Sequence, residues 1–102
     1  MTERAADTHA RITREIAQEK AVTLGRAGER LEAALATLAG LAAAYSSARD
    51  EAARAELAAE YEQAWRGADL ARQMLLIQRE AVGLRHHRDV DTQFPQPARR
   101  LA

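Results

Sequence analysis

The sequence predicts an all-α protein, folded as a long antiparallel helical hairpin that dimerises into a four-helix bundle. Ala, Leu, Glu, Arg and Gln dominate the composition and are strong helix formers, whereas β-branched and aromatic residues are few. Apolar and small residues recur alternately four and three positions apart on both sides of one interior turn signal. A second apolar stripe follows the turn, and the two helices of a single chain cannot bury it as well.

The first helix is expected over residues 3–44, within a single domain that spans residues 1–102. Its seam has the spacing of a coiled coil and consists of Ala17, Ala21, Leu24, Gly28, Leu31, Leu35, Leu38, Ala42 and Tyr45. Gly25 and Gly28 each cost a helix about 1 kcal/mol relative to alanine, so a break there would give three helices. We favour a continuous helix, because a break would lose the register of the seam before Leu24.

A turn is expected at residues 45–47 and a second helix over residues 47–90. Ser47 with Asp50 three residues later resembles a capping box, which predicts that Ser47 is the N-cap. The seam resumes at Leu57, Tyr61, Ala64, Ala68, Ala71, Leu75, Gln78 and Val82. If the chain reverses near residue 46, residue i faces roughly residue 92 minus i. This register pairs Leu31 with Tyr61.

The tail, residues 91–102, is expected to be extended. Pro95 and Pro97 forbid a continuing helix, and the residue before each proline is biased towards extended backbone. Phe94 is expected to pack over the helix end, with the remaining residues loosely ordered.

The second stripe is the main evidence for self-association. It contains Leu70, Met74, Ile77, Ala81 and Leu84, and Trp65 and Leu76 add apolar area outside the seam. Leaving several such side chains in water forgoes about 1.5 to 3 kcal/mol each. A symmetric homodimer is the simplest remedy, and its predicted interface consists of Trp65, Leu70, Met74, Ile77, Ala81, Leu84, Ile12 and Ile16. We expect Ile77→Asp to dissociate it and to lower stability together, and Leu76→Asp to do less.

Two alternatives to the homodimer remain open. A monomer with three helices could cover the stripe within one chain, if the first helix breaks at Gly25 to Gly28. The stripe could also be a docking groove for a helix of an unidentified protein partner.

Charge and composition exclude several classes of function. The net charge is zero, without the basic face of a nucleic-acid-binding module, and there is no cysteine. The apolar run at residues 33–45 is too short to span a membrane, and charged residues throughout positions 2–19 argue against a signal peptide and for a cytoplasmic location. No catalytic motif is present. The sequence therefore predicts a protein that is not an enzyme, has no cofactor, and acts as a scaffold, adaptor or regulatory interaction module.

The competing interpretation is a helical bundle that binds a metal or small molecule. The predicted register gathers His9, His86 and His87 at the open end of the hairpin, together with Asp7 and Asp89. No metal-binding helix motif accompanies them, and polar residues at the end of a bundle are the ordinary explanation.

The stretch MLLIQREAVGLRHHRDV, residues 74–90, resembles the C-terminal signature of an uncharacterised family of short all-helical bacterial proteins, a domain of unknown function. The resemblance extends back through IAQEKAVTLGRAGERLEAAL, residues 16–35. It implies no activity and no functional residues. The tail QPARRLA is shorter than the terminal helix of such proteins.

Overall fold

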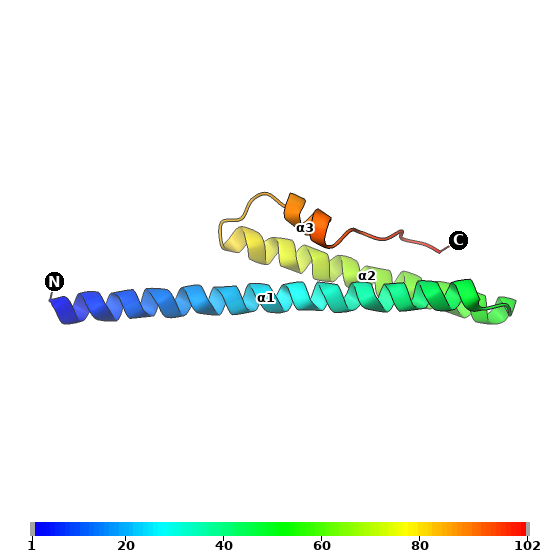
Figure 1. Cartoon of the computed structure of the whole chain (residues 1–102), viewed down its shortest axis with the longest axis horizontal. Helices are drawn as coiled ribbons and strands as arrows, with labels where there is room; N and C mark the ends of the chain where they lie inside the picture. Colours follow the sequence, from blue (N-terminus) through cyan, green and yellow to red (C-terminus); the bar gives the residue numbers. More distant parts are fainter. Residues whose placement is uncertain (1, 102) are drawn as a thin grey trace.

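The computed structural model describes residues 2–101, which form three helices and no strand. Helix α1 spans Glu3–Ser47, α2 spans Glu51–Ala81 and α3 spans Arg88–Gln93. The two long helices lie antiparallel, and the residues after α2 fold back along it as a third layer (Figure 1). The molecule is a rod measuring 74 × 21 × 16 Å. The predicted all-α helical hairpin is confirmed.

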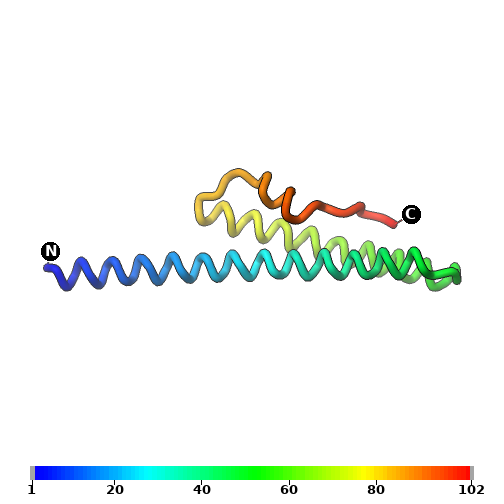
Figure 2. The backbone as a smooth tube through the Cα atoms, viewed as in Figure 1, coloured from blue at the N-terminus to red at the C-terminus, as the bar shows by residue number. Residues whose placement is uncertain are grey.

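Helix α1 is continuous through Gly25 and Gly28. It begins at the N-cap Thr2, whose Oγ1 accepts a hydrogen bond of 3.3 Å from the backbone N–H of Ala5. Because its 45 residues extend about 67 Å, α1 is much longer than α2. Its N-terminal part therefore projects beyond the end of α2 (Figure 2).

The turn lies three residues later than predicted. Ser47 is the last residue of α1, and the N-cap of α2 is Asp50, whose carboxylate accepts a 3.0 Å hydrogen bond from the N–H of Ala53. Both residue types are good N-caps, but a carboxylate also interacts favourably with the helix dipole. Arg54 holds the turn by donating hydrogen bonds to the carbonyls of Tyr45, at 2.9 Å, and Ala48, at 3.2 Å. It supplies the cation that the last turn of α1 lacks.

This change in the turn shifts the pairing of the helices by one heptad. Arg54 lies over the ring of Tyr45, 4.1 Å from its centroid, and Val82 shares a hollow with Ala17. Residue i therefore faces about residue 99 minus i, seven positions from the prediction. The predicted pair of Leu31 with Tyr61 is wrong, because the cluster that contains Tyr61 is built around Leu38. A heptad seam repeats every seven residues, so either register buries the same seam.

Helix α2 ends at Ala81, nine residues before the predicted end. Gly83 has a φ of 92°, in the left-handed region that glycine adopts without steric cost. The N–H of Leu84 bonds to the carbonyl of Arg79 at 2.9 Å, and the N–H of Gly83 bonds to that of Glu80 at 3.0 Å. These two bonds form a Schellman motif, which terminates the helix and reverses the chain.

Residues 84–101, the return segment, then run back along α2. Val90 of α3 is only 2% exposed and joins a core cluster with Ala27, Leu31 and Leu75. Phe94 packs against that cluster, and Leu101 packs against the second cluster, which centres on Leu38, Tyr61 and Ala68. The predictions that helix continues to residue 90 and that the tail is loosely ordered are both wrong. The return segment instead contributes Val90 to the hydrophobic core, and Phe94 and Leu101 of the tail pack against the core from outside.

Candidate interface on the outer face of α2

Helix α2 has three faces, which differ in what covers them. The seam face, which includes Ala68 and Leu75, packs on α1. The return face, which includes Trp65 and Arg72, lies under the return segment. At 100° per residue, Leu70 and Met74 fall on the opposite side of the helix from both. We call this third surface the outer face; it consists of Leu70, Met74, Ile77 and Ala81.

The return face holds the return segment through its backbone carbonyls. The hydroxyl of Tyr61 donates to the carbonyl of Ala98 at 2.5 Å, and Nε1 of Trp65 donates to that of Pro97 at 3.1 Å. Further along α2, Arg72 donates to the carbonyl of Phe94, and Arg79 donates to that of His86 at 3.0 Å. The four donors recur along one side of the helix. They satisfy carbonyls that have no strand or helix partner.

This arrangement removes Trp65 from the predicted interface. Its indole is bonded to Pro97, it packs beside Leu101, and the guanidinium of Arg99 lies 5.5 Å from the ring centroid. Leu76 is likewise covered, because it packs against the cluster that contains Val90. The sequence identified both side chains as surplus apolar area. It could not show that the chain's own C-terminal segment covers them.

The outer face retains the apolar stripe that the sequence indicates. The exposed fractions are 59% for Leu70, 44% for Met74 and 55% for Ile77, and Ala81 is exposed as well. Single exposed apolar residues are common, but a continuous row of them on one helix is typical of an interaction surface. Leu84 is 43% exposed but lies in the turn after Gly83. It adjoins the stripe without continuing its helical spacing.

The two predicted residues of α1 lie on the part that projects beyond α2, and each is 48% exposed. Ile16 lines a hollow of about 300 Å³ that Gln78, Ala81 and Val82 also line, so it adjoins the end of the outer face. Ile12 instead lies among Thr2, Arg4, Ala5, Thr8 and His9 of α1 itself. The structure therefore brings Ile16, but not Ile12, to the residues of α2.

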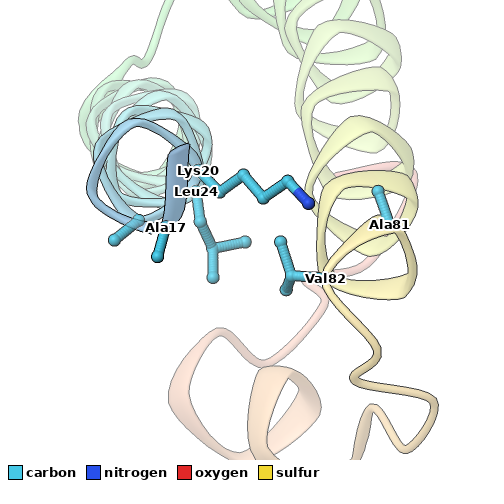
Figure 3. A pocket seen from close by; sticks show the side chains of 6 residues that line it. Ala17, Lys20, Leu24, Ala81 and Val82 are labelled. Carbon is cyan, nitrogen blue, oxygen red and sulfur yellow. The ribbon is translucent and has the colours of Figure 1, made fainter. Parts of the chain in front are cut away.

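A second hollow, of about 410 Å³, lies where α1 continues past the last turn of α2. Figure 3 shows Leu24 and Val82 pointing toward each other across it, while Lys20 extends from α1 towards α2. The methyl groups of Ala17 and Ala81 complete the labelled lining. Apart from Lys20, the side chains that line this hollow are apolar, and the hollow lies at the end of the outer face.

One edge of the outer face carries a defined charge pattern. Arg66, Gln73 and Glu80 follow one another at seven-residue intervals and therefore occupy the same heptad position beside the stripe. Arg66 is exposed and donates to Oε1 of Gln63 at 3.3 Å. The side chain of Glu80 is 57% exposed and its Oε1 lies 3.0 Å from Nε2 of His87. Both charged groups remain accessible to a partner.

The three histidines are not assembled into a metal site. Within residues 2–101, no group of three or more His, Cys, Asp or Glu side chains is placed to hold a metal ion. His87 is paired with Glu80, the backbone carbonyl of His86 accepts from Arg79, and His9 lies on the projecting part of α1. The predicted gathering of these residues depended on an α2 that continued as a helix through residue 90. The turn at Gly83 removes that condition.

Comparisons with family models, with curated proteins and with solved structures found no match. The resemblance to a family of all-helical bacterial proteins stays a prediction. Among the described helices, none has an apolar stretch long enough to cross a bilayer. The protein is a helical hairpin in which the return segment covers one side of α2 and the outer face of α2 stays apolar and exposed.

Proposed function

We propose that this protein is a non-enzymatic helical module that self-associates, with a second copy covering the outer face of α2, and that it serves as a scaffold, adaptor or regulatory partner. The observation that carries the proposal is the exposed row of Leu70, Met74 and Ile77. A cytoplasmic location and a bacterial origin stay predictions.

Charge complementarity favours a second copy in antiparallel orientation. When two helices pair antiparallel, residues at the same flanking heptad position face each other across the interface, which sets the orientation of the pair. Arg66 of one copy then faces Glu80 of the other, twice by symmetry, and Gln73 meets Gln73 at the two-fold axis. Parallel pairing would set Arg66 against Ala71, and Glu80 against Arg85, which lies beyond the end of α2, so no ion pair would form between the two helices.

The same register gives well-matched apolar layers. Leu70 of one copy packs against Met74 of the other, and Ile77 packs against Gly67, which leaves room for a large side chain. A single two-fold axis near the centre of the stripe thus gives both the apolar contacts and the ion pairs. A docking site for an unrelated helix would have no reason to show this self-complementary pattern.

The expected interface is modest in size. The overlapping halves of two α2 helices would bury roughly 1,000 Å² in total, at the low end for specific interfaces. The three large side chains of each copy are about half exposed and would contribute roughly 1 kcal/mol each on burial. After the cost of association, we expect a dimer that forms at micromolar concentrations.

The test is a charge swap measured by sedimentation equilibrium. Arg66→Glu should weaken dimerisation by roughly 5- to 30-fold, because two exposed attractions become repulsions. Adding Glu80→Arg should restore most of the affinity. Arg26→Glu, an exposed substitution on α1, is the matched control and should have no effect.

Two results would contradict the proposal. One is a monomeric wild-type chain at concentrations near 100 μM, well above the range expected for such an interface. The other is a dimer whose mass is unaffected by both Arg66→Glu and Ile77→Asp, since the copies would then meet through another surface.

A further inference from the structure

We infer that the return face of α2 is a binding site for extended, proline-containing peptides, and that residues 94–101 occupy it as a ligand built into the chain. The site is made by Tyr61, Trp65 and Arg72, with α1 as its second wall. It lies on a different side of α2 from the outer face, so the inference is independent of self-association.

The recognition chemistry is that of proline-rich peptides. Trp65 and Tyr61 donate to the successive carbonyls of Pro97 and Ala98, and Arg72 donates to that of Phe94. Proline has no N–H and keeps an extended segment in a low-entropy form, so its carbonyls are left for donors on the receptor. Aromatic residues that carry a donor at the edge of an apolar ring are suited to this task.

The groove is not filled by its present occupant. A hollow of about 180 Å³ remains beside the two prolines, lined also by Leu35, Leu38, Ala39, Ala42 and Tyr61. The side chains that line it are apolar except for the tyrosine hydroxyl, which is already bonded to the carbonyl of Ala98. A peptide with a larger apolar side chain near the prolines would fill this space and gain contacts that the chain's own segment does not make.

Charge defines the other end of the ligand. Nε of Arg100 lies 3.2 Å from the carboxylate of Glu62, and the guanidinium of Arg99 lies over the ring of Trp65. The preferred ligand is therefore a short extended peptide with one or two prolines followed by basic residues. Because α2 supplies an acid and an aromatic face at that point, an acidic peptide would be rejected.

The built-in ligand is ordered on α2 but can open without unfolding the rest of the chain. Val90 is buried and anchors α3, but none of residues 94–101 is buried. Those residues are attached by hydrogen bonds, by an exposed ion pair and by the packing of Phe94 and Leu101 on the outside of the two core clusters. Attachment at the surface is typical of a segment that opens locally without global unfolding. Release of residues 94–101 would expose the site, including Arg72, while Val90 keeps α3 in the core.

The experiment uses the full chain and its single tryptophan, Trp65, as the reporter. The double substitution Arg100→Glu and Leu101→Asp loosens the built-in segment and leaves the groove unchanged. A synthetic peptide FPQPARRL, identical to residues 94–101, is titrated while Trp65 emission is followed. We expect saturable binding, at least tenfold tighter to this variant than to the wild type, where the built-in segment competes.

Two controls identify the contacts. A peptide with alanine in place of both prolines should bind more weakly, and Tyr61→Phe in the loosened variant should weaken the original peptide about fivefold through loss of one hydrogen bond. Ile77→Asp, on the outer face, should leave peptide binding unchanged.

The inference would be overturned by a loosened variant that stays helical by circular dichroism and shows no saturable change with the peptide. Equal binding of the alanine peptide would also overturn it. So would loss of binding in Ile77→Asp, since the peptide would then sit on the outer face. Self-association is measured separately by mass, so the proposed function can fail or hold whether or not the peptide binds.

Discussion

The return face and the outer face of α2 are built on one helix from different kinds of side chain. The return face carries three hydrogen-bond donors, Tyr61, Trp65 and Arg72. Each donates a hydrogen bond to a backbone carbonyl of the return segment. The outer face carries Leu70, Met74 and Ile77, which have no donor to offer and stay about half exposed. One face is suited to irregular backbone and the other to the apolar face of another helix.

The difference shows that an excess of apolar side chains outside the seam does not by itself define an interface. Trp65 and Leu76 belonged to the same surplus as Ile77 when only the sequence was considered, yet the chain covers the first two itself. A segment without regular structure needs partners for its carbonyls, so it settles where side-chain donors are available. The all-apolar face is left for another molecule.

The largest effect is expected from Val90→Asp, which attacks the anchor of the return segment. Val90 is 2% exposed against Leu31 and Leu75, so an unpaired carboxylate there should cost about 3 to 5 kcal/mol. Urea unfolding measures the loss, and Trp65 emission should shift to the red as the segment leaves. An unchanged Trp65 spectrum would mean that the segment is held without this anchor.

A pair of adjacent substitutions separates the two faces. Leu76→Asp should lower the free energy of unfolding of the monomer by about 2 to 3 kcal/mol, because Leu76 packs against the core cluster. Ile77→Asp should cost the monomer less than about 0.5 kcal/mol and abolish the dimer, because its side chain is 55% exposed.

Unfolding at low protein concentration measures the stability of the monomer, and the mass at high protein concentration measures dimer formation. This expectation reverses the sequence-based ranking of the two residues for stability. Equal destabilisation by both substitutions would show that the two faces are not distinct.

Glycine substitutions test the reversal that directs the chain onto the return face. Gly83→Ala should destabilise by about 1 to 2 kcal/mol, because alanine at a φ of 92° is strained. Gly25→Ala should instead stabilise by up to about 1 kcal/mol, since the site is helical and a Cβ would meet nothing within 4 Å. Thermal melts of the two variants should therefore shift in opposite directions.

The smallest effect concerns the turn that sets which residues of α2 meet α1. Asp50→Ala should cost about 1 kcal/mol by removing the hydrogen bond to Ala53. Ser47→Ala should be close to neutral, because Ser47 ends α1 and caps nothing. A larger loss of stability from Ser47→Ala than from Asp50→Ala would contradict this result. It would support the predicted turn at residues 45–47 and the register that goes with it.

Much of the fold was predictable because it depends on local pattern. The seam from Leu24 to Leu38 and its continuation through Leu75 follow from heptad spacing, and the exposed stripe of Leu70, Met74 and Ile77 follows from the same reasoning. The end of α2 was predictable in principle from Gly83, a glycine that lies shortly before the polar run at residues 85–89. The contacts of Trp65 were not, because its partners lie more than 30 residues away.

By itself, the sequence determined that the chain forms two long helices with one shared apolar seam and a second apolar stripe. These properties depend on residue type and spacing, which act over a few turns of helix. Only the tertiary structure decided which of two equivalent heptad registers is used and where the return segment lies. Both choices depend on contacts between distant residues, at the Arg54 turn and along Tyr61, Trp65 and Arg72, and no local pattern encodes them.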